Sequence, residues 1–398
     1  MLERFFRQFE NPAALLAIVV AVLMTLGTVM VYSASGARAG LEDIRIMAKH
    51  ETHPDEDYRF HHGSEYFMKQ LMWAAIGLGV GFGLMKIPME TIERYALPIL
   101  VISFVVLLLV VASPLGMESK GAKRWLRLGP LTLQPSEFAK ICLVIFMAKM
   151  LSDKREQIKN LLRGFLPAVA VMGAFALLIM LQKDLGTIML SGCVVVGMWC
   201  LAQVRFRHLG SMVLLALPAL VYLIFQHSYR LNRILAFLDS EKYGMTYGYQ
   251  LNQSLIAVGS GGLFGQGLGL GLQKYHFLSE SHTDFIFAIV CEELGLVGAV
   301  SVVVLFLAFI LLGVRISYRA TDYFSGLLAA GLTMIVGCAA FINFFVVLGL
   351  APTKGLALPF FTYGGSSLIA SIICTALLIK ISNESTGMRS APPREAAA

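Results

Sequence analysis

Residues 294–314 read LGLVGAVSVVVLFLAFILLGV and contain no Asp, Glu, Lys or Arg. A helix that crosses a bilayer needs about 20 consecutive apolar residues, so this run predicts a transmembrane helix. Further uncharged runs occur at 11–37, 70–85, 95–117, 164–182, 185–204, 209–226, 323–353 and 355–379. The shortest, 70–85, is bracketed by Lys69 and Lys86, whose long side chains can reach the membrane surface.

The composition of the whole chain is that of a membrane protein. Of its 398 residues 14% are charged, whereas a soluble domain has about 25%, and the mean hydropathy is +0.73. A tenth apolar segment, 135–151, carries Glu137, Lys140 and Lys149. We therefore predict an all-α, polytopic membrane protein with ten transmembrane helices, which places both termini on one side.

The density of basic residues sets the predicted orientation. Short loops rich in Lys and Arg face the cytoplasm, and the loops on the side of the N-terminus are the shorter ones. They contain Lys154, Arg155, Lys159, Arg163, Arg205, Arg207, Arg315 and Arg319. Both termini are therefore predicted to be cytoplasmic, with a large outer loop between helices 7 and 8. The net charge of +7 is scattered between the spans and does not indicate nucleic-acid binding.

The chain is predicted to form a single domain, residues 1–398, without repeats. Its first outer loop, 38–65, is rich in His and acidic residues and could bind a metal or be a solvated loop; the histidines are His50, His53, His61 and His62. Residues 383–398 are small and polar and predict a disordered cytoplasmic tail. All six cysteines lie in or against apolar runs, which excludes a disulfide framework.

The large outer loop, 227–283, contains the glycine-rich stretch QSLIAVGSGGLFGQGLGLG at 253–271. No G-x-G-x-x-G register, Gly-Lys-Ser/Thr sequence or βαβ unit accompanies it, so a nucleotide site is excluded. Irregular backbone near a membrane must be buried in protein or line a watery cavity. The stretch therefore predicts close backbone packing or re-entrant turns.

Asp284 opens the apolar sequence DFIFAIV, which Glu292 and Glu293 then interrupt. Carboxylates at a membrane segment are costly and indicate function. In a helix Asp284 would lie about 15 Å outside the uncharged run, at its outer mouth. Small residues at 288, 291 and 295 share its helical face and would leave room for a cavity. The alternative is that Thr283 or Asp284 caps the helix.

Cations gather on the same outer side, namely Lys120, Lys123, Arg124, Arg230, Arg233, Lys274 and Lys354. Lys140, inside a span, needs a partner or an anionic ligand, and Glu137 three residues earlier could be that partner. Cations around one carboxylate suit a diphosphate leaving group and a hydroxyl nucleophile. Asp184 is a second outer-face acid that could pair with one of the cations.

Several motifs together resemble a known family. They are RW at 124–125, QPSEFAK at 134–140, QKDLGT at 182–187, YQLNQS at 249–254, GSGG at 259–262, HTDFIF at 282–287, EELG at 292–295 and PFFTYGGSS at 359–367. In this order they are similar to the SEDS family (shape, elongation, division and sporulation), that is FtsW/RodA/SpoVE. The sequence PTKG at 352–355 resembles the division branch, FtsW, more than the elongation branch.

The resemblance implies a ten-helix enzyme that polymerises lipid II into glycan strands at the outer face of the bacterial cytoplasmic membrane, at the division site. It implies that Asp284 is the general base, and that a class B penicillin-binding protein, other divisome proteins, lipid II and membrane lipid are partners. The predicted substrate-binding residues are Lys120, Lys123, Arg124, Lys140, Gln182, Asp184, Gln253, Ser254, His282, Lys354, Tyr363, Ser366 and Ser367. No protein metal site is predicted, and whether a divalent cation (Mg²⁺ or Mn²⁺) assists stays open.

The sequence departs from the family pattern at Lys183, where proline is usual, at 270–271 and 279–281, and in its long first outer loop. Three other functional interpretations remain. A lipid II flippase would also have an intramembrane lysine and glycine-rich segments, although inverted repeats are not visible. An elongation-type polymerase and a scaffold that only recruits the transpeptidase are the others.

Overall fold

The computed structural model describes residues 11–52, 63–114, 116–119, 121–129, 131–225, 228–239, 243, 246, 248–275, 277–278 and 281–390. Its helices are α2 (Pro12–Thr52), α3 (Gly63–Met85), α4 (Met89–Arg94), α5 (Ala96–Ala112), α6 (Pro135–Asp153), α7 (Leu166–Leu181), α8 (Leu185–Leu201), α9 (Phe206–Phe225), α10 (Ser228–Leu238), α12 (Tyr249–Ser260), α13 (Ile286–Arg319), α14 (Tyr323–Val347) and α15 (Gly365–Ser390). A π-helical turn, Leu161–Phe165, leads into α7.

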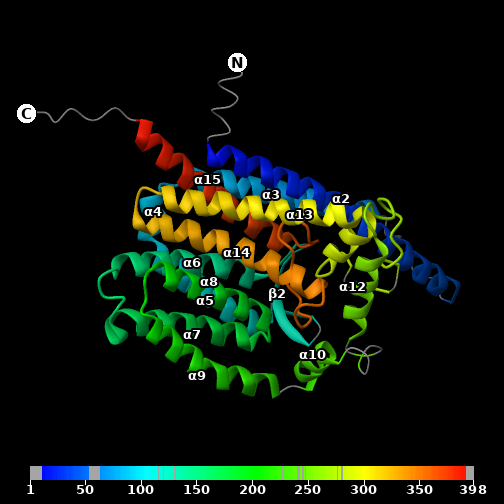
Figure 1. The fold of residues 1–398 in the computed structure, drawn as a ribbon. Helices are drawn as coiled ribbons and strands as arrows, with labels where there is room; N and C mark the ends of the chain where they lie inside the picture. Colours follow the sequence, from blue (N-terminus) through cyan, green and yellow to red (C-terminus); the bar gives the residue numbers. More distant parts are fainter. Residues whose placement is uncertain are drawn as a thin grey trace, which may run out of the picture.

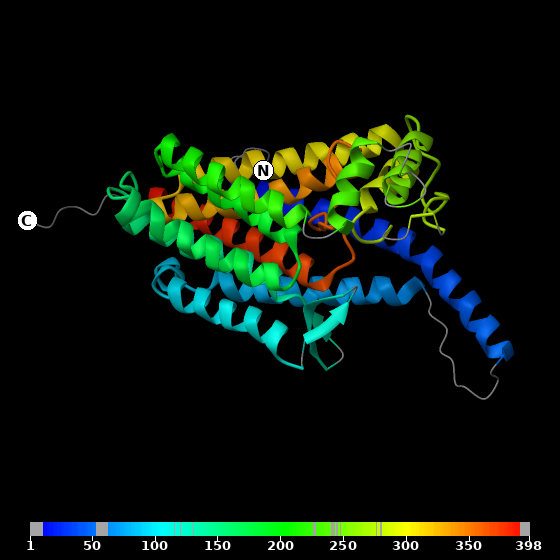
Figure 2. The same ribbon diagram turned by 90° about the horizontal axis from the view of Figure 1, so that it is seen from below.

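The long helices run side by side in one bundle (Figures 1 and 2). Among the described residues, six segments are long and apolar enough to cross a membrane, in α2, α3, α7 with its preceding turn, α13, α14 and α15. The apolar segments of α14 and α15 are the most buried of the six, so these two helices form the centre of the bundle. The chain is therefore a multi-pass helical membrane protein, as predicted.

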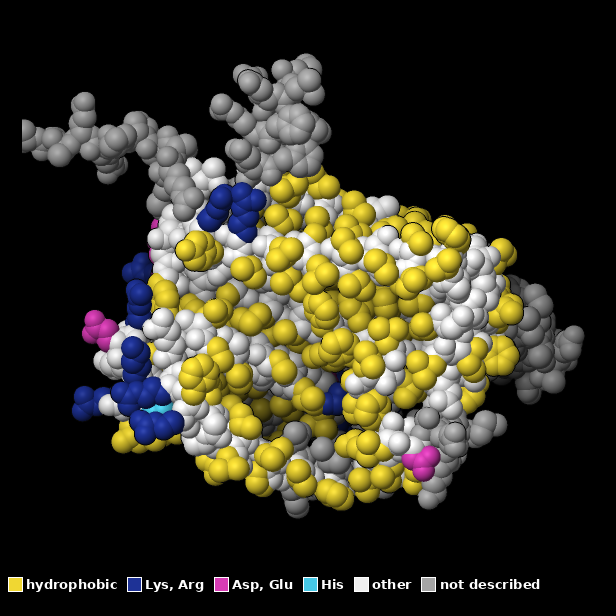
Figure 3. Space-filling view, viewed as in Figure 1, with side chains coloured by type: hydrophobic (Ala, Val, Ile, Leu, Met, Phe, Trp, Pro, Cys, Tyr) yellow, Lys and Arg dark blue, Asp and Glu magenta, His cyan; other side chains and the backbone are white. Residues whose placement is uncertain are grey.

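The two ends of the bundle differ in structure and charge. Figure 1 shows that α2 begins and α15 ends at one end, while α10, α12 and the small sheet lie at the other. The sheet is antiparallel, with β1 (Gly116–Ser119), β2 (Ala122–Leu128) and β3 (Leu131–Leu133) in that order. In Figure 3, Lys and Arg side chains gather at the end that holds the start of α2 and the end of α15, and hydrophobic side chains cover the middle.

Several predicted boundaries are wrong. Residues 38–52 continue α2 rather than beginning a loop, and 383–390 continue α15 rather than forming a disordered tail. The histidine cluster of the first loop lies largely outside the described residues, as do 391–398. The uncharged runs 323–353 and 355–379 extend beyond the helices, because α14 ends at Val347 and α15 begins at Gly365.

The connection between α14 and α15, residues 348–364, is non-helical, and its residues 356–362 are largely buried. Pro352 and Pro359 cannot continue a helix, and Phe360 has a left-handed φ of 66°. Phe360 and Phe361 are almost completely buried. Their backbone packs so closely against Gly27 of α2 that a side chain there would collide with it. This α14–α15 loop therefore lies inside the bundle.

Helix α13 is interrupted at Gly295, whose φ and ψ are 66° and −165°. The backbone groups freed there bond to the glycine-rich loop: Gln266 and Gly267 donate their N–H groups to the carbonyls of Glu292 and Glu293, at 2.9 and 3.1 Å. In return, the N–H groups of residues 296 and 297 donate to the carbonyls of residues 262 and 263. The predicted close backbone packing is confirmed.

Candidate active site

Asp284 precedes α13 at the end of the bundle where α10, α12 and the sheet lie. The N-cap position of α13 is Phe285, so neither Thr283 nor Asp284 occupies the position that the capping alternative requires. The side-chain amide of Asn343, on α14, donates to the backbone carbonyls of Asp284 at 2.7 Å and Leu356 at 2.8 Å. One buried amide thus ties the catalytic candidate to both α14 and the α14–α15 loop.

The half-buried carboxylate of Asp284 lies against Gly355 of that loop. A Cβ atom at position 355 would lie 2.6 Å from Oδ2 of Asp284, so glycine leaves the space that the carboxylate occupies. The same loop holds the two preceding residues. The carbonyl of Thr283 accepts from Thr362 Oγ1 at 3.2 Å, and the carbonyl of His282 accepts from the Tyr363 N–H at 3.0 Å. The segment 282–284 therefore runs alongside the loop and shares its rigidity.

Lys354 stands next to Gly355 and brings a positive charge to this region. Its ammonium group contacts the thioether of Met189 on α8, and no carboxylate among the described residues forms an ion pair with it. Burial lowers the pKa of Lys354 below the ordinary lysine value, because a desolvated ammonium is destabilised. An anion bound beside Lys354 would relieve that cost.

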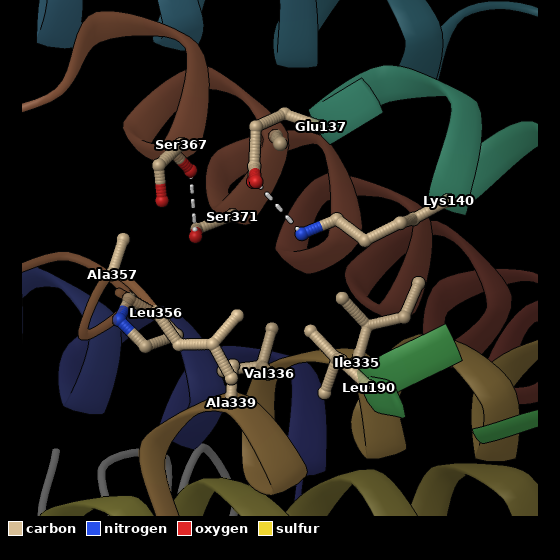
Figure 4. A pocket seen from close by; sticks show the side chains of 12 residues that line it. Glu137, Lys140, Leu190, Ile335, Val336, Ala339, Leu356, Ala357, Ser367 and Ser371 are labelled. Atoms are coloured by element: carbon tan, nitrogen blue, oxygen red, sulfur yellow. Dashed lines mark hydrogen bonds and ion pairs between the residues drawn. The ribbon is translucent and has the colours of Figure 1, made fainter. Parts of the chain in front are cut away.

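A cavity of about 30 Å³ lies behind the loop, between α6, α8, α14 and α15. Figure 4 shows Glu137 and Lys140 of α6 on one side, Ser367 and Ser371 of α15 on another, and Leu356 with its neighbour Ala357 closing it toward the loop. Nζ of Lys140 lies 2.9 Å from Oε1 of Glu137, and both side chains are largely buried. The intramembrane lysine thus has the carboxylate partner that the sequence offered. The cavity has room for ordered water but not for a sugar ring.

The small residues on the α13 face below Asp284 do not line this cavity. The glycine-rich loop occupies that face: a side chain at Gly261 would collide with the carbonyl of Cys291, and Gly295 lies against Gly265. The prediction of a cavity there is therefore wrong, because backbone fills the space that the small side chains leave.

His282 and Tyr363 form an aromatic cluster with Tyr66 of α3. The ring centroids of His282 and Tyr363 are 6.1 Å apart, and those of Tyr66 and Tyr363 are 5.2 Å apart. Burial raises the pKa of Tyr363 above the ordinary value, so this phenol stays protonated and can donate a hydrogen bond. The cluster adjoins Asp284 through the Tyr363 N–H bond to the carbonyl of His282.

The side chains of Arg124 and Asp184 form local hydrogen bonds within the protein. The Arg124 guanidinium, on β2, donates to the carbonyls of Gln182 at 3.1 Å and Lys183 at 2.7 Å, where α7 ends. Asp184 caps α8, accepting from the Thr187 N–H at 3.2 Å and its hydroxyl at 2.9 Å. The prediction that Asp184 pairs with a cation is wrong among the described residues. Lys183 has a φ of 56°, which the family's usual proline could not adopt.

The other predicted substrate-binding residues are placed on several elements. The buried side chain of Gln182 donates to the carbonyl of Leu107. The Ser254 hydroxyl donates to the carbonyl of Val347. The Ser366 hydroxyl accepts from the N–H of Gln134. Gln253 lies half-buried on α12, and Lys123 lies opposite Glu118 in the sheet. Lys120 lies outside the described residues. Around Asp284 the structure thus gathers His282, Lys354 and Tyr363, with Lys140 and Ser367 behind them.

Glu292 and Glu293 anchor the glycine-rich loop. Glu293 is completely buried and accepts from Nζ of Lys274 at 2.6 Å and from the Ser33 hydroxyl of α2 at 2.7 Å. One carboxylate oxygen of Glu292 accepts the N–H of Leu272 at 2.7 Å and of Gln273 at 3.1 Å. The two acids that interrupt the apolar run are therefore structural.

Sequence reasoning missed Asn343 and Gly355. Asn343 is the lone carboxamide in the uncharged sequence of α14, and a polar group at such a position must find a partner; that signal was available. Gly355 had no signal beyond its place next to Lys354. Among the described residues, no group of three or more His, Cys, Asp or Glu side chains is arranged to hold a metal.

Comparison with known proteins gives the family. The sequence model of the family described as "Cell cycle protein", FtsW/RodA/SpoVE, matches residues 13–387. The chain belongs to this family. Within it, the chain is 40% identical over 381 residues to a protein of Geobacter metallireducens named "Probable peptidoglycan glycosyltransferase FtsW", covering 96% of this chain and 97% of that protein. It is 37% identical to "Stage V sporulation protein E" of Bacillus subtilis, covering 94% and 98%.

Solved structures of family members share the fold. A chain from a structure described as "Structural coordination of polymerization and crosslinking by a peptidoglycan synthase complex" matches with a TM-score of 0.72 and 28% identity, over 93% of this chain and 97% of that one. The rod shape determining protein RodA of Thermus thermophilus matches with a TM-score of 0.65 and 26% identity, over 93% and 96%. The predicted resemblance to the FtsW/RodA/SpoVE family is confirmed.

Proposed function

We propose that this chain is a peptidoglycan glycosyltransferase that polymerises lipid II into glycan strands during septal wall synthesis. Its similarity to FtsW proteins along nearly the whole chain supports this function. The observation that carries the assignment of the site is the Asp284 carboxylate, held against Gly355 beside Lys354. Gly355 is exposed, so a hydroxyl-bearing sugar can approach the carboxylate from that side.

In the proposed reaction, Asp284 accepts the proton of the 4-hydroxyl of the acceptor sugar. The resulting oxygen nucleophile bonds to the anomeric carbon of the donor, and the bond from that carbon to undecaprenyl diphosphate breaks with inversion. The leaving diphosphate keeps the electron pair, and a cation beside it lowers the energy of the developing charge. Lys354 is the described cation best placed for this role, because no carboxylate among the described residues neutralises it.

We further propose that all ten apolar segments cross the membrane within a single domain, residues 1–398, with both termini in the cytoplasm. Each predicted segment overlaps a described helix, and basic side chains gather at the end where α2 begins and α15 ends (Figure 3). The positive-inside tendency of short loops supports this orientation. Asp284 then faces the outer side of the cytoplasmic membrane, at the division site.

The proposed partner is a class B penicillin-binding protein, which would crosslink the strands that this chain makes. The fold match to a peptidoglycan synthase complex supports a partner of this kind. Other divisome proteins would direct the pair to the septum.

The function is tested with the chain purified together with its transpeptidase in detergent and supplied with lipid II. We expect glycan polymer on a gel, and we expect Asp284→Asn to lower the rate at least about 10²-fold, the contribution of a positioned base. Asp153→Asn is the matched control, because that carboxylate is 53% exposed in a surface ion pair on the opposite end of the bundle.

A flippase has nothing to cross in a micelle, so polymer formation distinguishes the enzyme from the transporter. Polymer made by wild type and by Asp284→Asn at similar rates would keep the enzyme but remove Asp284 as its base. Absence of polymer from a folded complex, combined with lipid II transport in vesicles, would favour the flippase.

A further inference from the structure

The glycine-rich loop, residues 261–273, exposes a row of large apolar side chains. Phe264 is 80% exposed and Leu270 is 66% exposed, and Leu263, Leu268 and Leu272 are similarly uncovered. The segment GGLFGQGLGLGLQ contains no charged residue. A contiguous exposed apolar surface indicates contact with a membrane or another protein.

Three glycines of this loop, Gly261, Gly265 and Gly271, pack against the start of α13. A side chain at Gly265 would collide with the backbone of Glu293, and one at Gly271 would approach the Glu292 carboxylate to 2.8 Å. Gly265, Gly267 and Gly269 have φ values of 80°, 104° and 83°, which larger residues rarely adopt. Gly261, Gly265 and Gly271 therefore give the loop close backbone contacts with α13, while its leucines and Phe264 are exposed.

Many backbone N–H groups of the loop donate hydrogen bonds within the protein. Its N–H groups bond to the broken turn of α13 and to the two glutamates, including Gly269 N–H to Glu293 Oε2 at 3.0 Å. Lys274, which follows the loop, is buried in its ion pair with Glu293. Irregular backbone can lie at membrane depth only when its polar groups are satisfied within the protein, and these bonds satisfy several of them.

The apolar side of the loop continues the surface of α13. Leu296, Val297, Val300 and Val304, which follow the break, are each at least half exposed, as expected for side chains that face lipid. Hydrophobic side chains cover the face along α13 toward the end where α12 lies (Figures 1 and 3). The loop residues bonded to 296 and 297 therefore lie beside lipid-facing positions.

We propose that residues 261–273 form a re-entrant membrane segment whose leucine and phenylalanine side chains lie in the hydrocarbon of the leaflet at the Asp284 end of the bundle. The occupant of this surface is lipid. The segment joins α12 to the residues before Asp284, so lipid contact fixes its depth, and the bonds to α13 fix its position in the plane. This proposal is independent of the reaction assigned to Asp284.

The test places a tryptophan in the loop of the full chain and measures its quenching in lipid nanodiscs. Phe264→Trp replaces one exposed aromatic residue by another, and Leu270→Trp provides a second site. Val304→Trp, 54% exposed on α13, is the lipid-facing reference. Fluorescence is compared with that of the wild-type chain, which has 3 tryptophans, in nanodiscs of phosphatidylcholine with brominated acyl chains and, separately, with aqueous iodide.

We expect brominated lipid to quench the added fluorescence of both loop variants as strongly as that of Val304→Trp, and iodide to quench it weakly. Strong iodide quenching with little effect of brominated lipid would overturn the proposal. The measurement is repeated after addition of the partner transpeptidase. If lipid quenching then disappears in the loop variants and persists in Val304→Trp, the surface belongs to a protein partner, and the proposal is wrong.

Discussion

Gly355→Ala tests the position of the Asp284 carboxylate without changing any ionisable group. The new Cβ atom would lie 2.6 Å from Oδ2 of Asp284, whereas ordinary contact begins at 3.4 Å, so the carboxylate must move by about 0.8 Å. Position 355 does not have the left-handed φ that only glycine tolerates, and Asp284 is a short, mobile side chain. We therefore expect the fold to persist and the carboxylate to be displaced.

The expected loss of rate follows from that displacement. A misplacement of about 1 Å in a reacting group can cost about 10²-fold, which corresponds to about 2.7 kcal/mol in the activation free energy. Initial rates of lipid II polymerisation, measured with the partner transpeptidase in detergent, should fall by about 10- to 10²-fold. The thermal unfolding temperature of the same preparation should change little.

Gly364→Ala is the matched control, because a Cβ atom there would meet only Ser367, at 3.9 Å. It should retain the wild-type rate. The double variant with Asp284→Asn should be no slower than Asp284→Asn alone, since both changes act through one carboxylate. A wild-type rate for Gly355→Ala, or losses that multiply in the double variant, would refute this placement of the base.

Three further predictions concern the surroundings of the site. Lys274→Met leaves the Glu293 carboxylate buried without its cation, which should destabilise the fold by about 3–5 kcal/mol and lower the unfolding temperature in detergent. An unchanged unfolding temperature would contradict the presence of this buried ion pair. Burial lowers the pKa of Lys354, so this lysine loses its charge at a lower alkaline pH than an ordinary lysine does, and polymerisation should decline there. Lys354→Arg should shift that decline to higher pH. Identical pH profiles of the two proteins would remove Lys354 from the reaction. Arg124→Lys can keep only one of two carbonyl contacts, so it should lower the unfolding free energy by about 1 kcal/mol and leave the rate per folded enzyme nearly unchanged; a large rate loss without destabilisation would restore the predicted diphosphate role.

Charge patterning predicted the helices well and their ends poorly. A run without Asp, Glu, Lys or Arg reports which residues avoid water, and residues 356–362 of the α14–α15 loop are largely buried although they are not helical. Residues 348–364 therefore looked like parts of two spans, although Pro352 and Pro359 interrupt the helix there. The helix after Asp284 was predicted to begin close to Ile286, where α13 does begin, but its break at Gly295 was not predicted.

The candidate site was predictable where a motif defines it and less so where partners are backbone groups. The family resemblance selected Asp284, and spacing along α6 correctly suggested the Glu137–Lys140 pair. Arg124 was assigned to the diphosphate of the substrate and Asp184 to a cation, because their residue types suggest charged partners. Their actual partners are main-chain carbonyls, a main-chain N–H and a threonine hydroxyl, and residue type alone does not identify such partners.

The two non-helical segments at this end of the bundle explain why the catalytic candidate lies outside a helix. Within a helix, the backbone groups of Asp284 would bond along their own chain, and its side chain would follow the helix surface. Here its carbonyl accepts from Asn343 of α14, and the neighbouring carbonyls accept from the α14–α15 loop. The segment before it is held in turn by Glu292 and Glu293 through the glycine-rich loop. Three separate parts of the chain therefore position the backbone of Asp284 and its neighbours, so a change in any of them should alter the reaction.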